Sequence, residues 1–236
     1  MKQITLSRKL RKPVALATAK RTAGQTTGPT DSQTEQRILD AAHVVFLSRG
    51  TAGARMQDIA AQAGVNQALL HYYFRSKARL SEAIFRRAAQ QLFPRVIEVM
   101  ASETELEDKV RRVVQLELDH LSQAPYLPGY ILSELTHHAE RAPQLISTLV
   151  GMTPEAVGPK IAAALRRQID ARVRAGTMRP ISPEQFMVNL ISLCIFPFAA
   201  RPMIMALFGM DQRGFDRFID KRRLELAAFF LGALRP

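Results

Sequence analysis

Residues 67 to 77 carry amide, aromatic and basic side chains that suit a helix in contact with DNA. A glutamine amide can bond adenine at two points, alanine and leucine can meet a thymine methyl group, and histidine and tyrosine can donate to phosphates. A lysine at a helix N-terminus adds its charge to the free backbone amides there, and both suit a phosphate. We assign these residues to base edges: Gln67, Ala68, Leu69 and Tyr72. We assign these residues to phosphates: His71, Tyr73 and Lys77.

Two short helices joined by a tight turn must position these side chains. Apolar spacing predicts the first helix from about Met56 to Ala63, and Gly64 ends it because glycine adopts the left-handed conformation of a helix terminus. The side-chain oxygen of Asn66 can cap a second helix, which runs from Gln67 to about Phe74. Ser76 then caps a third, longer helix. This is the helix-turn-helix arrangement, whose second helix fits the DNA major groove.

The same segment resembles the TetR (tetracycline-repressor) family of bacterial transcriptional regulators. The matching residues occur in order and without gaps: Asp58-Ile59-Ala60, Ala63-Gly64-Val65, Leu70, Tyr73-Phe74, Ser76-Lys77 and Leu80. The close resemblance covers about Glu35 to Leu80, and the remainder matches in helical layout and length. It implies a three-helix DNA-binding domain followed by a helical domain that dimerises and binds a small effector.

Two positions depart from the family pattern, and two others join the predicted contact set. His71 stands where the family usually has tyrosine, and Ala54-Arg55 replaces the usual serine or threonine at the start of the second helix. In the family both positions touch the DNA backbone. The resemblance implies that Gln57, in the first turn of that helix, reaches a base. We add Asn66, which begins the recognition helix.

Charge and composition favour a polyanionic partner. The 236 residues have a net charge of +12, and 47% are hydrophobic, enough for a core. Residues 1–30 carry seven Lys/Arg and no acid, residues 31–80 carry six and four, and residues 81–236 carry twenty and seventeen. We therefore divide the chain into a basic, disordered arm (1–30), a DNA-binding domain (31–80) and an effector-binding and dimerisation domain (81–236). The arm either contacts phosphates or a minor groove, or is a solubilising tail or a start codon assigned too early.

The remaining pattern predicts an all-α protein in the cytoplasm. A first helix is expected from about Gln33 to Arg49, capped by Asp31 or Ser32 and ended by Gly50. The single cysteine, Cys194, excludes an internal disulfide and suits a reducing compartment. No signal peptide is expected. The apolar stretch from Phe186 to Phe208 is interrupted by charged, polar and proline residues, so it predicts a buried interface helix, and we expect no membrane partner.

The last two helices are more apolar than the surface helices of a monomer. A capping sequence at Ser182 opens one of them, which Pro197 and Pro202 disturb, and the other runs from about Gln212 or Gly214 to Leu234. In the family, the matching pair forms a four-helix dimer interface. The alternative is that both are core helices of a monomer. We expect a homodimer, because one helix-turn-helix unit contacts few bases and a twofold dimer contacts two half-sites roughly 34–36 Å apart.

Two Glu-x-x-His pairs raise an alternative from another class. Glu117/His120 and Glu134/His137 lie on successive helices, and such pairs with two further glutamates form di-iron sites in helical bundles. The alternative is therefore a di-metal oxidoreductase, although two such pairs arise easily by chance. A weaker interpretation assigns this set to a regulatory pocket: His120, Tyr130, Glu134, His137 and His138.

Other enzyme signatures are absent from the sequence: there is no Gly-x-Ser-x-Gly, glycine-rich phosphate loop or zinc spacing. We therefore expect no catalytic residues, cofactor or resident metal. The sequence predicts a homodimeric, sequence-specific regulator, a repressor, which binds double-stranded DNA at a palindromic operator and is released by a small molecule. A third interpretation is a nonspecific, nucleoid-type DNA binder driven by the basic arm.

Overall fold

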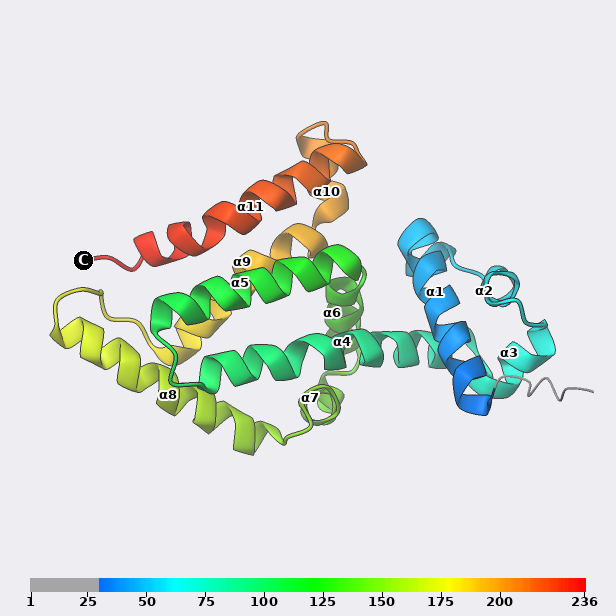
Figure 1. The fold of residues 1–236 in the computed structure, drawn as a ribbon, viewed down its shortest axis with the longest axis horizontal. Coiled ribbons are helices and arrows are strands. Elements are labelled where there is room, and N and C mark those ends of the chain that lie inside the picture. Colours follow the sequence, from blue (N-terminus) through cyan, green and yellow to red (C-terminus); the bar gives the residue numbers. More distant parts are fainter. Residues whose placement is uncertain (1–29) are drawn as a thin grey trace, which may run out of the picture.

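Helices are the only regular secondary structure in residues 30–236, the part of the chain that the computed structural model describes (Figure 1). This confirms the predicted all-α fold. The helices are α1 (Asp31–Gly53), α2 (Met56–Ala63), α3 (Gln67–Phe74), α4 (Lys77–Ala101), α5 (Leu106–Gln123), α6 (Leu127–His137), η1 (Ala139–Arg141), α7 (Ala142–Val150), α8 (Pro154–Arg174), α9 (Pro183–Ala199), α10 (Arg201–Leu207) and α11 (Gln212–Gly232). Apart from Thr30, the predicted basic arm lies outside the described residues.

The first helix begins two residues earlier than predicted. Thr30, rather than Asp31 or Ser32, is the cap: its hydroxyl accepts from the Gln33 N–H at 3.4 Å. The Gln33 side chain accepts in return from the Thr30 N–H at 2.9 Å, so two free amides are satisfied reciprocally. Gly50 breaks the helical path as expected, with a φ of 67°, although one more short turn follows it.

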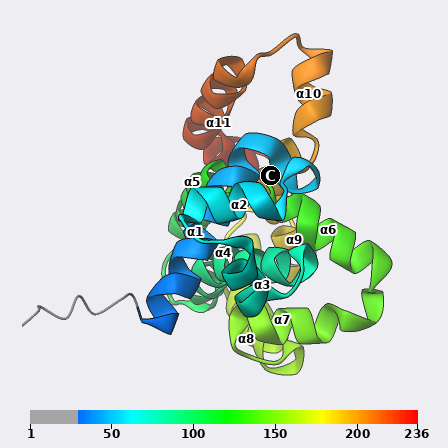
Figure 2. The same cartoon turned by 90° about the vertical axis from the view of Figure 1, so that its right-hand side faces the viewer.

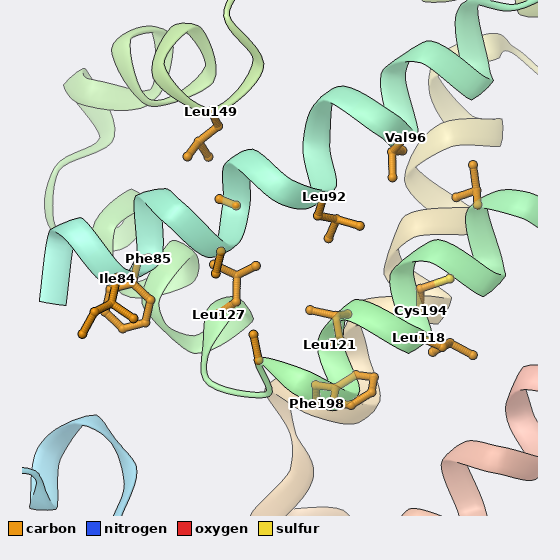
Figure 3. Close-up of a cluster of buried hydrophobic side chains, with 14 of the residues drawn as sticks. Ile84, Phe85, Leu92, Val96, Leu118, Leu121, Leu127, Leu149, Cys194 and Phe198 are labelled. Carbon is orange, nitrogen blue, oxygen red and sulfur yellow. The ribbon is translucent and has the colours of Figure 1, made fainter. Parts of the chain in front are cut away.

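A single long helix connects the two parts of the molecule. The helices α1, α2 and α3 gather at one end, around the first turns of α4 (Figure 1, Figure 2). The helix α4 then continues through the C-terminal part, where it packs against α5, α7 and α8. Figure 3 shows Leu92 and Val96 of α4, Leu118 and Leu121 of α5 and Cys194 of α9 around one apolar core. The residue-80 boundary predicted from sequence therefore falls inside α4.

Lys109, a fully buried cation on α5, forms a hydrogen bond with a free backbone carbonyl at the C-terminal end of α4. Its ammonium donates to the Met100 carbonyl oxygen at 3.0 Å, one of the last carbonyls of that helix. Burial lowers the pKa of Lys109. The hydrogen bond and the helix dipole offset the desolvation of the charge, so the turn between α4 and α5 is held in place.

The C-terminal helices are arranged differently from the prediction at Pro197 and Pro202. The helix α9 continues through Pro197 to Ala199, and the chain then bends by 69° into α10. Because Pro197 lacks an N–H, the carbonyl of Leu193 loses its helical partner. Arg222 of α11 replaces it, with Nε and Nη2 donating to the Leu193 oxygen at 3.1 and 2.7 Å. The carbonyl oxygen that Pro197 leaves without a helical partner thus accepts hydrogen bonds that join α9 to α11.

Within residues 30–236, no single helix has the length and apolarity to cross a membrane, and only the bent pair of α9 and α10 meets that test, by length and composition.

Glu117 is an ionisable group inside the apolar core. It is 2% exposed, and its Oε2 has no hydrogen-bond partner among the described residues. Burial raises the pKa of Glu117 to about 7. Burial, and then the nearby Glu117 charge, raise the pKa of the Cys194 thiol. Cys194 is therefore a buried, protonated thiol that packs as a small apolar side chain, as the sequence predicts.

Glu117→Gln should stabilise the protein at high pH and leave it nearly unchanged at low pH. The folded-state pKa of about 7 exceeds the ordinary value of 4.5, so the folded state holds the proton more tightly. Wild-type stability therefore falls as the pH rises from 4.5 to about 7. That difference in pKa corresponds to roughly 3 kcal/mol at pH 8, of which the variant should recover about 1–3. Urea unfolding at pH 5 and pH 8 measures this, with Glu98→Gln on the exposed face of α4 as the control. Equal effects of Glu117→Gln at both pH values would contradict the assignment.

Candidate nucleic-acid interface and ligand cavity

The turn between α2 and α3 is fixed by the residues that the sequence predicts. Gly64 has a φ of 64° at the end of α2, and the following Val65 N–H donates to the Ala60 carbonyl oxygen at 3.0 Å. Asn66 caps α3, where its Oδ1 accepts from the Leu69 N–H at 2.7 Å. Arg37 of α1 adds a contact that sequence spacing could not show, because Nη2 donates to the Ala63 carbonyl oxygen at 3.0 Å.

The two faces of α3 have different environments. Leu70 and Phe74 are buried against the domain core. The residues predicted to contact bases are exposed together on the outer side: Gln67, Ala68, Leu69 and Tyr72. Tyr72 is 72% exposed, and its ring meets Tyr73 edge-on at 5.3 Å. Core packing does not explain so large an exposed ring.

The three predicted phosphate contacts have partners within the protein. His71 Nδ1 donates to the Arg75 carbonyl oxygen at 3.1 Å, so a phosphate contact through Nε2 requires the protonated ring. The Tyr73 hydroxyl donates to Asp31 Oδ1 at 2.9 Å, and burial together with this carboxylate raises the Tyr73 pKa. Lys77 Nζ donates to the Ala52 carbonyl oxygen at 2.9 Å and has two further protons. Their phosphate contacts stay predictions.

Exposed arginines border α3 on both sides, and the predicted contact set omitted them. Arg55 precedes α2 beside the exposed Gln57, and Arg75 follows α3 with a left-handed φ of 52°. The Arg79 guanidinium is exposed in the first turn of α4. The clustering of basic residues around Lys77 could have indicated them. Residues 54 and 55 depart from the serine or threonine usual in the family at the start of the second helix. Here Ala54 is buried and the Arg55 side chain is exposed to solvent.

A cavity of ≈ 780 Å³ lies beside the first half of α4, between α4, α6 and α7. Its apolar wall includes Phe85, Leu127, Tyr130, Leu145 and Leu149, and charged or polar groups border it. Those groups are Ser76, Arg79, Ser81, Glu82, Arg86, His138, Gln144 and Thr148. Its volume lies within the range of small-molecule sites.

The five residues predicted for a regulatory pocket are not gathered in one place. Tyr130 and His138 line the large cavity. His120 lines a smaller one, of ≈ 190 Å³, and burial lowers the His120 pKa. His137 is exposed, with Nδ1 bonded to the Ser133 carbonyl oxygen at 2.8 Å. The structure does not describe the side chain of Glu134.

The Glu-x-x-His pairs do not form a metal site in the described part of the chain. Glu117 lies in the core near Cys194, whereas His120 faces the smaller cavity and His137 is exposed. Among the described side chains, no three His, Cys, Asp or Glu residues come together as metal ligands would. The geometry therefore gives no support to the di-metal interpretation.

Comparison with known proteins agrees with this arrangement. Residues 38–84 match the family described as bacterial regulatory proteins of the tetR family, and residues 107–223 match the tetracyclin repressor-like C-terminal domain. The chain belongs to the TetR family. Both halves of the resemblance predicted from the helix-turn-helix segment, the DNA-binding domain and the helical domain after it, are thereby confirmed.

Relatives of this TetR-family chain include two curated proteins and a solved structure. The nucleoid occlusion factor SlmA of Pasteurella multocida is 30% identical over 105 residues, 44% of this chain and 51% of that protein. The HTH-type transcriptional repressor SCO4008 of Streptomyces coelicolor is 31% identical over 112 residues, 46% and 57%. The chain thus spans about half the length of these curated relatives. The hemolysin II transcriptional regulator HlyIIR has the same fold, with a TM-score of 0.52, 21% identity and coverage of 87% and 98%.

Asn66→Ala should destabilise the DNA-binding domain by about 1 kcal/mol, because it removes the cap of the recognition helix. Urea unfolding measures the change. Gln67→Ala, at the next, exposed position, is the matched control and should stay within about 0.5 kcal/mol of wild type. Equal stabilities of the two variants would show that the bond from Asn66 to the Leu69 N–H contributes nothing.

Proposed function

We propose that this protein is a transcriptional repressor, which binds an inverted-repeat operator as a homodimer and is released by a small-molecule effector. The observation that carries the proposal is the outer face of α3. The helix is held in place by its cap, by its buried Leu70 and Phe74, and by the bonds to α1 from Tyr73 and from Lys77 at the start of α4. The side chains left outside match the chemistry of base edges, and arginines surround them.

The proposed dimer uses the last two long helices, α9 and α11. Both helices pack against α5, and the rings of Phe186 on α9 and Phe230 on α11 meet edge-on at 5.1 Å. Both still leave large apolar side chains in solvent, with Phe196 57%, Leu224 82% and Phe229 65% exposed. A monomer rarely exposes so many, and a second copy of the same pair would cover them. One DNA-binding domain contacts few bases, so a twofold pair is also what specificity requires.

The proposed effector site is the ≈ 780 Å³ cavity. It lies against the first turns of α4, directly after the recognition helix, so a change in its shape bears on the position of α3. The dimer has two states, one with recognition helices spaced for the operator and one with recognition helices spaced wrongly. An effector that binds the second state more tightly lowers the affinity for DNA, and the loss equals the difference between its affinities for the two states. We propose that the protein is cytoplasmic, because its partner is the operator DNA and its one cysteine is a free thiol. We also propose that it acts by binding that DNA and has no enzymatic activity.

Selection of bound sequences from a random DNA pool, with full-length protein at near-physiological salt, tests the proposal. Enrichment of an inverted repeat supports a dimeric, sequence-specific regulator. Binding without enrichment, which collapses as salt rises, would indicate a nonspecific binder driven by the N-terminal arm.

Gln67→Ala and Lys77→Ala should have different signatures on the selected operator. Loss of the amide should cost about 1–3 kcal/mol and relax the preference at one base pair. Loss of the ammonium should weaken all sequences alike and flatten the dependence on salt. Titrations against the operator and its single-base variants at several salt concentrations measure both. A change in sequence preference by Lys77→Ala would refute this division of roles.

The double substitution Leu224→Glu/Phe229→Glu should convert the dimer to a monomer, because it places four charges in the proposed twofold interface. Sedimentation equilibrium measures the mass. Leu132→Glu, on α6 and 52% exposed, is the control and should remain dimeric. An unchanged mass of the double variant would exclude α11 from the interface.

A further inference from the structure

Tyr126 extends from the turn between α5 and α6 to the DNA-binding domain. Its hydroxyl is hydrogen-bonded to His43 Nδ1 on α1. Its ring meets the Phe46 ring of α1 edge-on at 5.9 Å and the Phe85 ring of α4 at 5.4 Å. Burial raises the pKa of Tyr126 to about 12 and lowers the pKa of His43, so both groups of this bond are neutral at pH 7. The C-terminal part thus contacts α1 by a route separate from the covalent course of α4.

The same aromatic cluster reaches the wall of the ligand cavity. Phe85 stacks on Tyr130 of α6, with ring centroids 3.6 Å apart and an interplanar angle of 13°. Both rings line the ≈ 780 Å³ cavity, as does Leu127, the neighbour of Tyr126 in sequence. Figure 3 shows Phe85 and Leu127 on facing segments. The first turn of α6 is therefore part of the cavity wall and continuous with the contact on α1.

Other contacts between α1 and α4 are less suited to transmit a change in the cavity. The ion pair of Arg87 and Asp40, at 2.7 Å, is largely exposed, and exposed pairs contribute little. The Phe46–Phe85 contact, with centroids 6.1 Å apart, joins α1 to α4 directly, but Phe85 is held on its other side by Tyr126 and Tyr130. A ring in a close-packed cluster cannot shift alone, since packed cores switch between discrete arrangements.

We propose that Tyr126 is the positioning residue that couples the cavity to the DNA-binding domain. An occupant that separates Tyr130 from Phe85 moves the first turn of α6, and Tyr126 then leaves its place against His43 and Phe46. The helix α1 is freed, and with it the recognition helix that Tyr73 ties to Asp31 of α1. This inference rests on the proposed function for the role of the cavity, but the contact of Tyr126 with α1 does not depend on it.

Because coupling between two sites is reciprocal, operator binding must also change α6, and this can be measured without knowing the effector. The chain has no tryptophan. Leu135→Trp, on α6 at the cavity and 38% exposed in the native protein, therefore introduces a single fluorescent reporter away from the aromatic stack. Operator duplex should shift its emission, and the shift should be lost when Tyr126→Ala is added although the duplex still binds.

Phe93→Ala is the matched control, since it removes a partly buried ring of α4 outside this cluster and should leave the shift intact. If Tyr126→Ala does not fold, Tyr126→Leu keeps apolar volume without the ring or hydroxyl and takes its place. The proposal is overturned if the parent reporter binds operator with no change in emission. It is equally overturned if the Tyr126 variant responds as the parent does, or if Phe93→Ala abolishes the response.

Hydrogen exchange without DNA separates this inference from the proposed function. Tyr126→Ala should raise amide exchange in α1 by about tenfold or more and leave α9 and α11 unchanged, because it removes a contact with α1 and none with α9 or α11. Faster exchange in α1 from a protein that fails to select an operator would support the contact while the proposed function falls. Unchanged exchange in α1 would overturn the role of Tyr126 whatever the protein binds.

Discussion

Burial of one face of α4, first against the N-terminal helices and then against the C-terminal helices, constrains the rest of the molecule. Leu80, Ile84 and Phe85 are buried where α4 meets α1, and Leu92 and Val96 are buried where it meets the C-terminal helices. Each such side chain contributes about 1.5–3 kcal/mol on full burial, so neither part can rotate about α4 without losing several contacts of that size. The recognition helix precedes α4 by two residues, so its orientation follows from that of α4.

Hydrogen bonds within the first domain order the proposed DNA-contact surface in the absence of DNA. Tyr73 and Lys77 donate to Asp31 and Ala52, and Arg37 donates to the end of α2. These bonds fix side chains and helix ends that would otherwise lose conformational freedom on binding, so less of the interaction energy is needed to order them. Arg55, Arg75 and Arg79, in contrast, extend into solvent, where they suit phosphates at variable positions.

The parts of the fold that depend on neighbouring residues were predictable, and the parts that depend on distant ones were not. Gly64, Asn66 and Ser76 act within a few residues of themselves, and the structure places each as the sequence predicts. Arg222 and the Leu193 carbonyl are 29 residues apart, and His43 and Tyr126 are 83 apart. Their types carry no sign of a partner, since an arginine beside a proline-interrupted helix has many possible partners.

The residues that line the cavity also come from distant parts of the chain, so the sequence predicted them poorly. Of the proposed pocket residues, Tyr130 and His138 line it, but His120 lies at a different cavity because α5 turns that side chain toward α1. The walls come from three helices whose packing depends on volumes rather than on a motif. Local capping and turn chemistry therefore predicted the helix-turn-helix, whereas the proposed effector cavity required the assembled structure.

Titration of the selected inverted repeat against the same repeat with about five extra base pairs between its half-sites tests the central claim most directly, because the insertion turns one half-site by about half a helical turn. Two recognition helices held by one twofold dimer cannot then face both half-sites. The account predicts one dimer on the native repeat and a loss of affinity on the lengthened one, to that of a single half-site. Equal affinity for the two duplexes would contradict it, since each DNA-binding domain would then act independently of the other.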